Sequence, residues 1–277
     1  MNTKWRLILD DKCNGYYNMA VDEAIFSLYP ELKTPTLRIY GWSEPFLSLG
    51  YNQEQSEVLK PKINIPFVRR ITGGAAILHD CEITYSLTCS LGDLNLPREV
   101  KKSYEVLNSF IRNFYRKLGL KAEFAKDVFC EGLGRRENFC FCSSEYFDFV
   151  INGKKIGGNA QRRKKDLIFQ HGSIPQKLNF SLIENCINDT AHLSEKTTFL
   201  EELFEAGCPA NREIIDGFCA AFENSFNVRL ESARLSAEER HASYGLMETK
   251  YTTKEWNLSK IHNSAINTGY QRGINAC

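Results

Sequence analysis

The sequence lacks long hydrophobic runs and any marked excess of charge of one sign. No apolar stretch is long enough to cross a bilayer, and the first six residues contain no apolar core of the kind that a secretion signal needs. The formal net charge of +1 gives no general attraction to nucleic acids or to membrane surfaces. We therefore expect a cytoplasmic protein that binds neither nucleic acid nor membrane.

Closely spaced metal ligands are also scarce. The chain has ten cysteines, but only Cys140 and Cys142 lie close together, and no second pair follows them as a structural zinc site would require. Since no signal for an oxidising compartment is present, we expect most of the thiols to be reduced, small and buried. The sequence therefore predicts no metal site.

The rest of the composition is that of a globular protein with a substantial core, because 43% of the residues are hydrophobic and 25% are charged. Apolar residues at helical spacing predict helices at 18–28 and 98–118, and mostly helix after residue 181. The buried face of the helix at 98–118 is expected to contain Val106, Phe110, Phe114 and Leu118. Short apolar or alternating segments predict strands at 36–40, 46–50, 66–70, 75–79, 83–89, 146–151 and 167–173.

This order of elements indicates an α+β fold. Strands occur in runs with helices gathered around them, which is typical of mixed or antiparallel sheets flanked by helices. We expect one main domain at 1–226 and a small helical C-terminal segment at 227–277 that docks on it.

The stretch at 69–80 has the composition of a ligand-binding loop. Two arginines, Arg69 and Arg70, precede the glycine pair Gly73 and Gly74. Tandem glycines let a ligand approach backbone amides closely, and arginine supplies a fixed positive charge with planar donors. The combination suits an acyl or phosphate-bearing ligand, although a glycine pair between strands is more often a simple turn.

A cysteine and a lysine offer chemistry for acyl transfer. Asn152-Gly153 predicts a tight hairpin, with Cys140 just before its first strand and Lys155 on the returning strand. A nearby ammonium lowers the pKa of a thiol, and it can also hold the oxyanion that forms when a thioester is attacked. The alternative interpretation is structural, because Cys140 between two phenylalanines suits a core and Lys155 suits a solvated turn.

Several short motifs, spread from about Trp5 to about Trp256, together resemble one group of enzymes. They are NMAVD at 18–22, TLRIYGW at 36–42, LSLGYNQ at 47–53, RRITGG at 69–74, LH at 78–79, EITYS at 82–86, CF at 140–141, GKK at 153–155, AQ at 160–161, QHGS at 170–173, KY at 250–251 and EWN at 255–257. With them the chain resembles the biotin/lipoate protein ligase superfamily, and within it the cysteine-type octanoyltransferases that act on octanoyl-acyl carrier protein. The resemblance implies the catalytic-domain fold of that superfamily.

The resemblance also implies a reaction and its partners. Cys140 falls on the cysteine that carries the acyl thioester in this group, and Lys155 falls on the lysine that lowers the pKa of that thiol. Octanoyl would pass from octanoyl-acyl carrier protein to a lysine of a lipoyl-domain protein, expected to be the H protein of the glycine cleavage system, with no ATP or other cofactor. The implied substrate-binding residues are Arg70, Thr72, Gly73, Gly74, His79, Asn159 and Ala160.

Three rival interpretations remain open. An ATP-dependent lipoate or octanoate ligase would use Lys155 on an acyl-adenylate, and Cys140 would then have no role; His-Asp-Cys-Glu at 79–82 favours the transferase over the His-Asp-x-Gly-Asn usual in ligases. An octanoyl amidotransferase would take its acyl group from the H protein. A non-catalytic acyl-binding protein would form no acyl-enzyme at all.

Details of the pocket depend on a few positions. Cys140 matches the family cysteine better than Cys142, because it leaves the following strand in register. Ala75 stands where the octanoyltransferases usually have arginine, and Asn159 replaces the usual serine. We expect a narrow apolar tunnel beside 70–74, where burying six methylenes would contribute up to about 5 kcal/mol.

A basic run at 162–165 is a candidate docking rim for the acidic acyl carrier protein, since Arg162, Arg163, Lys164 and Lys165 follow one another. A surface loop with no partner is the alternative interpretation of the same run.

Overall fold

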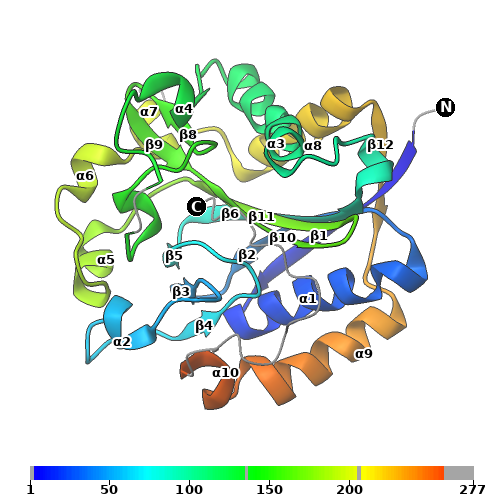
Figure 1. Ribbon diagram of the computed structural model, residues 1–277, viewed down its shortest axis with the longest axis horizontal. Helices are drawn as coiled ribbons and strands as arrows, with labels where there is room; N and C mark the ends of the chain where they lie inside the picture. The colour runs from blue at the N-terminus through cyan, green and yellow to red at the C-terminus, as the bar shows by residue number, and fades with distance from the viewer. Residues whose placement is uncertain (1–2, 135–136, 205–206, 259–277) are drawn as a thin grey trace.

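The computed structural model describes residues 3–134, 137–204 and 207–258, and in them it shows an α+β fold around a six-stranded mixed sheet (Figure 1). The strand order is β10-β11-β6-β2-β1-β12. These strands are β1 Thr3–Cys13, β2 Thr36–Trp42, β6 Glu82–Ser90, β10 Asn159–Lys164, β11 Leu167–Pro175 and β12 Val228–Ala233. β1 is parallel to both of its neighbours, and the other neighbouring strands are antiparallel. The predicted fold class is confirmed.

Two three-stranded sheets, ordered β4-β3-β5 and β7-β8-β9, complete the strands. Their members are β3 Phe46–Leu49, β4 Phe67–Arg69, β5 Ile77–His79, β7 Glu123–Phe124, β8 Phe149–Ile151 and β9 Lys154–Gly157. Both small sheets lie toward the same end of the large sheet in Figure 1. They carry part of the candidate site, with Ser48 on β3, His79 on β5 and Lys155 on β9.

Helices cover both faces of the large sheet, with α3 and α8 on one face and α1 and α9 on the other (Figure 1). The helices are α1 Gly15–Leu32, α2 Gln55–Val58, α3 Val100–Lys117, α4 Ala125–Val128, α5 Phe180–Cys186, α6 Leu193–Lys196, α7 Leu200–Leu203, α8 Asn211–Phe226, α9 Ala237–Leu246 and α10 Lys254–Leu258. Short 3₁₀ turns occur at Leu91–Leu94 and Cys140–Cys142, and a π-helical turn at Met247–Tyr251. No helix within the described ranges is long and apolar enough to span a membrane.

The core between the sheet and α3 is rich in aromatic side chains. Phe110 and Phe114 of α3 are fully buried, as predicted, and Phe110 contacts Phe218 of α8 edge-on with ring centroids 5.1 Å apart. Val106 is 41% exposed, so its predicted place on the buried face is wrong. The buried stripe instead passes through Leu107, which is one position further round the helix.

Four strands, β1, β7, β10 and β12, were not expected from the sequence. β1 and β12 pair with each other, and β10 lies in the basic region that suggested a loop. The C-terminal segment is therefore not wholly helical. The expected strand at 146–151 begins only at Phe149.

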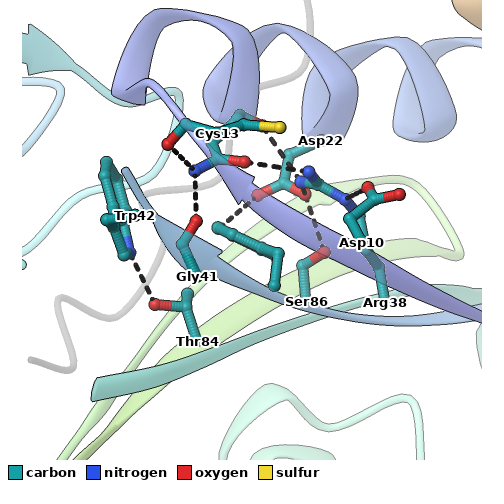
Figure 2. A network of polar contacts seen from close by, with 10 residues as sticks. Asp10, Cys13, Asp22, Arg38, Gly41, Trp42, Thr84 and Ser86 are labelled. Atoms are coloured by element: carbon teal, nitrogen blue, oxygen red, sulfur yellow. Dashed lines mark hydrogen bonds and ion pairs between the residues drawn. The ribbon is translucent and has the colours of Figure 1, made fainter. Parts of the chain in front are cut away.

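Arg38 on β2 is fully buried and joins α1 to the large sheet (Figure 2). Its guanidinium donates to Asp22 Oδ1 at 2.8 Å and to Asp10 Oδ2 at 2.7 Å, and two oxygens of Asn18 accept its remaining bonds. Ser86 on β6 also donates to Asp22 at 2.7 Å. Because a buried charge is costly unless it is paired, this cluster fixes the position of α1 on β2 and β6.

The segment after residue 227 contacts α1 and β4. β12 extends the large sheet, and α9 packs on α1. Lys250 Nζ lies 2.6 Å from Glu23 Oε2 of α1, and the Trp256 indole donates to the backbone carbonyl of Arg69 at 2.7 Å. Residues 259–277 of the expected C-terminal segment lie outside the described residues, and the division at 226/227 stays a prediction.

Candidate active site

A tight hairpin brings the predicted cysteine and lysine together. Asn152 and Gly153 both have positive φ, 52° and 76°, which is the backbone that a two-residue hairpin turn with Asn-Gly adopts. The turn joins β8 to β9, and Lys155 lies on β9. Cys140 opens the 3₁₀ turn upstream of the hairpin, and its backbone N–H donates to the carbonyl of Ala76 at 2.8 Å.

The Lys155 ammonium contacts the Cys140 thiol in a buried setting. Its Nζ lies 3.5 Å from Cys140 Sγ and donates to the backbone carbonyls of Cys140 and Ser143 at 2.6 and 3.0 Å. Lys155 is 1% exposed and Cys140 is 3% exposed. The interpretation of Lys155 as a solvated turn lysine is therefore wrong.

Asp148 is the counter-ion of this lysine. Its Oδ2 lies 2.6 Å from Lys155 Nζ, and both side chains are 1% exposed. Burial raises the pKa of the Asp148 carboxyl, and the Lys155 ammonium and the backbone N–H of Glu145 oppose that rise. A Cβ on Gly158 would come within 2.4 Å of Asp148 Oδ1, so glycine at 158 leaves the room that this carboxylate occupies.

Arg70 stabilises the backbone of the glycine loop through hydrogen bonds. Its guanidinium donates to the carbonyls of Ser48, Gly73 and Ala75 at 3.1, 2.7 and 2.8 Å. The loop also passes close to Gly50, where a Cβ would come within 1.8 Å of the Gly74 carbonyl oxygen. The predicted binding arginine thus organises the backbone of its own loop.

A cavity adjoins Cys140 and Arg70 of the glycine loop. It is lined by Ser48, Arg70, Ile77, His79, Thr84, Cys140, Gly158, Ala160, His171, Gly172 and Ser173. Three predicted binding residues, Arg70, His79 and Ala160, therefore share one cavity with the predicted nucleophile. Although several lining residues have polar side chains, the surface that they expose to the cavity is mainly apolar, as expected for a site that holds an acyl chain.

Two histidines of the cavity have different partners. His171 Nε2 lies 2.7 Å from Thr72 Oγ1, and burial lowers the pKa of His171 well below its usual value, with Arg70 and His79 adding to the shift. His171 is therefore neutral at pH 7. His79 lies between Ser48 Oγ at 2.8 Å and Glu82 Oε1 at 2.7 Å.

Thr72, Gly73, Gly74 and Asn159 are the predicted binding residues outside this lining. Thr72 forms a hydrogen bond with His171, which lines the cavity, and the two glycines belong to the loop whose carbonyls accept from Arg70. The side chain of Asn159 instead bonds to Tyr85 and Asn108 in the interior. A role for Asn159 in substrate binding stays a prediction.

The basic run at 162–165 is only partly on the surface. Arg162 donates to the carbonyl of Ile71 at 3.2 Å, and Arg163 donates to Gln161 at 2.6 Å, so both are half-buried. Lys164 and Lys165 are exposed at the end of β10.

Sequence reasoning missed Asp148, Ser48 and Glu82 as site residues. Asp148 had a signal, because a carboxylate within the apolar run 147–151 needs a buried partner. In the described part of the chain, no three His, Cys, Asp or Glu side chains are grouped as metal ligands would be.

Comparison with known proteins identifies the family. The sequence pattern described as Lipoyl protein ligase A/B catalytic domain matches residues 14–223, which include Cys140, Lys155 and the glycine loop. The chain belongs to this family. Among its relatives, Octanoyltransferase LipM of Bacillus subtilis (strain 168) is 34% identical over 276 residues, covering 92% of this chain and 98% of that protein. Octanoyltransferase LipM of Kyrpidia tusciae is 36% identical over 276 residues, with 92% and 99% covered.

Solved structures support the lipoyl protein ligase A/B fold. A lipoate-protein ligase A bound with ATP superimposes with a TM-score of 0.78 at 21% identity, covering 94% of this chain and 100% of that one. A putative lipoate protein ligase of T. acidophilum with bound lipoic acid gives a TM-score of 0.75 at 22% identity, covering 92% and 99%. At these identities the likeness establishes the fold.

Proposed function

We propose that the protein is an octanoyltransferase of protein lipoylation that works through an acyl-thioester on Cys140. The donor is octanoyl-acyl carrier protein, and the acceptor is a lysine of a lipoyl-domain protein such as the H protein of the glycine cleavage system. The observation that carries the proposal is the 3.5 Å contact between Lys155 Nζ and Cys140 Sγ at a cavity edge. The relatives named octanoyltransferase match almost the whole chain.

In the first half-reaction the Cys140 thiolate attacks the thioester carbon of the octanoyl donor. The new C–S bond forms as the bond to the phosphopantetheine sulfur breaks, and that sulfur leaves as a thiolate. The Lys155 ammonium favours the ionised form of Cys140. Lys155 also supplies positive charge near the oxyanion of the tetrahedral intermediate. One thioester replaces another, so this step is close to thermoneutral.

In the second half-reaction the ε-amine of the acceptor lysine attacks the octanoyl-enzyme. An amide forms, Cys140 leaves as a thiolate beside Lys155, and the amine gives up one proton. Because an amide is more stable than a thioester, this step is downhill. Neither half-reaction requires ATP, and this distinguishes the proposal from an acyl-adenylate ligase.

Recognition of the acidic donor is proposed for Lys164 and Lys165, the exposed members of the basic run at 162–165. Changing both to alanine should slow transfer from octanoyl-acyl carrier protein and weaken its dependence on salt. Lys4 and Arg229, on β1 and β12 at the opposite edge of the sheet, serve as the matched control. An equal effect of both double variants would remove this proposal.

The experiment that tests the function measures transfer of octanoyl to the H protein with each donor in turn. We expect octanoyl-acyl carrier protein to support transfer without ATP, and free octanoate with ATP to support none. Activity that requires free acid and ATP would identify a ligase. Activity only with octanoyl-H protein as donor and another lipoyl domain as acceptor would identify an amidotransferase, and no activity with any donor would identify a binding protein.

A further inference from the structure

A second group of hydrogen-bonded polar side chains, besides Cys140 and Lys155, lies at the cavity wall. Ser48 on β3 and His79 on β5 are 2.8 Å apart between Oγ and Nε2, and His79 Nδ1 lies 2.7 Å from Glu82 Oε1 at the start of β6. Ser48 and His79 both line the cavity that Cys140 lines. A hydroxyl, an imidazole and a carboxylate in this order form the arrangement that moves protons in many acyl-transfer enzymes.

The neighbours of Ser48, His79 and Glu82 are compatible with proton transfer toward the carboxylate. Arg70 Nη1 donates to Ser48 Oγ at 3.2 Å and occupies one lone pair, so the Ser48 hydroxyl still has its own proton to donate to His79 Nε2 when that nitrogen is unprotonated. At the other end, Glu82 also accepts hydrogen bonds from the hydroxyls of Thr84 and Ser173. Since an ionised Glu82 can only accept, His79 donates to it from Nδ1, and in the neutral tautomer Nε2 can then accept from Ser48.

Glu82 remains ionised in spite of its burial. Burial raises the pKa of the Glu82 carboxyl, but the charge of a protonated His79 and the hydrogen bonds from His79, Ser173 and Thr84 lower it by more, so the net pKa is below its usual value. A buried carboxylate held in this way stabilises an imidazolium next to it. His79 can accept a proton from Ser48 without leaving an unpaired charge.

The ring of His79 is also held in one plane. Trp42 stacks on it with ring centroids 3.8 Å apart and an angle of 9° between the planes. The Trp42 indole donates to Thr84 at 2.8 Å, as Figure 2 shows, and Thr84 in turn bonds to Glu82. Hydrogen bonds through Thr84 therefore connect Trp42, which stacks on His79, to Glu82, which accepts from His79.

The two half-reactions differ in their need for a base. Thioester exchange starts from a thiolate that Lys155 already stabilises, so no proton has to leave the attacking sulfur. Attack by an amine is different, because the nitrogen must lose a proton as the amide forms. Lys155 is unsuited to accept it, since its ammonium is paired with Asp148 and faces the departing Cys140 thiolate.

We propose that Ser48, His79 and Glu82 form the proton relay of the second half-reaction. The acceptor amine forms its C–N bond to octanoyl and passes a proton to Ser48 Oγ, Ser48 passes its own proton to His79 Nε2, and the C–S bond to Cys140 breaks. The products are the amide, the Cys140 thiolate and an imidazolium paired with Glu82, which then releases its proton to water. The inference rests on the proposed function, because it assigns the base for that reaction.

The test measures the two half-reactions separately by intact mass. Octanoyl-acyl carrier protein is mixed with enzyme to follow acylation; the isolated octanoyl-enzyme is then mixed with the H protein to follow transfer. For Ser48→Ala we expect acylation close to that of the wild type and transfer slower by on the order of 10²-fold. The ratio of the two rates does not depend on the fraction of folded enzyme. Ser86→Ala removes a buried serine that bonds to Asp22 outside the cavity lining, and its ratio should equal that of the wild type.

Chemical rescue distinguishes a relay from a structural role. His79→Gly opens space beside Trp42, and added imidazole should restore transfer without changing acylation. Equal slowing of both half-reactions in Ser48→Ala, or absence of rescue in His79→Gly, would overturn the relay and leave the octanoyltransferase proposal intact. Absence of an octanoyl-enzyme in the wild type would overturn the proposed function and the relay with it.

Discussion

Lys155 Nζ and Asp148 Oδ2 are 2.6 Å apart, and the two side chains are equally inaccessible to solvent. The ammonium that contacts the Cys140 sulfur is therefore held by a carboxylate that substrate does not need to touch. The ionisation of the Cys140 thiol therefore depends on Asp148 as well as on Lys155.

Asp148→Asn should weaken the nucleophile without removing it. A buried ammonium without its carboxylate loses its proton more readily, so Cys140 loses the charge that favours its thiolate. We expect acylation at pH 7 to fall at least about tenfold, which corresponds to ~1.4 kcal/mol of transition-state stabilisation. We also expect alkylation of Cys140 by iodoacetamide to require a higher pH.

Glu202→Gln is the matched control for this variant. It breaks the exposed pair between Glu202 and Lys154, the residue next to Lys155, at a distance of 3.0 Å. Exposed pairs contribute little to stability, so acylation and alkylation should be unchanged. A pH profile of Cys140 alkylation that is the same in Asp148→Asn and the wild type would contradict the positioning role of Asp148.

Cys142 should be unreactive although it is only two residues from Cys140. Burial raises the pKa of the Cys142 thiol to about 11, and its Sγ contacts the carbonyl of Asp189 at 3.4 Å. At pH 7.5 we expect iodoacetamide to modify Cys140 well before Cys142, as read by peptide mass mapping. Faster labelling of Cys142 would favour the other cysteine as the nucleophile.

The sequence predicted much of the fold where the signals were local. The Asn152-Gly153 turn, the strands at β6 and β11 and the early helix α1 all follow from neighbouring residues. β1 and β12 depend instead on each other across more than 200 positions, with Thr3 opposite Val228. β10 was missed because its outer residues are basic, which is common in strands at a sheet edge.

The candidate site was predicted to a similar extent. Cys140 and Lys155 could be paired because a hairpin connects their segments. The contact between Ser48 and His79 comes from pairing of β3 with β5, where Ser48 is opposite Ile77. No local sequence pattern predicts this register, so Ser48 could not be predicted as the hydroxyl partner of His79.

Mutations in the buried Arg38 cluster should lower the free energy of unfolding strongly. Asp22→Ala leaves the Arg38 guanidinium without its buried carboxylate, and breaking such a pair costs about 3–5 kcal/mol. Asp10 bonds to the same guanidinium but is 24% exposed, so Asp10→Ala should cost less. Urea unfolding of the two variants checks the order, and equal losses would contradict it.

His171 should make stability fall in mild acid. Its pKa in the folded protein lies well below the ordinary value of 6.5, so the unfolded chain binds the extra proton first as the pH falls. The stabilising contribution is complete above about pH 6.5 and is lost below it. Relative to His171→Gln, the wild type should lose up to ~1.4 kcal/mol of unfolding free energy per pH unit. Parallel pH dependences of the two proteins would contradict a neutral buried His171.

The proposed mechanism depends on an octanoyl thioester on Cys140, and the intact mass of the enzyme detects this intermediate. Wild type and Cys140→Ser are mixed with octanoyl-acyl carrier protein in the absence of ATP. We predict one octanoyl adduct on the wild type that hydroxylamine removes, and no hydroxylamine-labile adduct on Cys140→Ser. No adduct on the wild type, or a labile adduct that persists in Cys140→Ser, would contradict it.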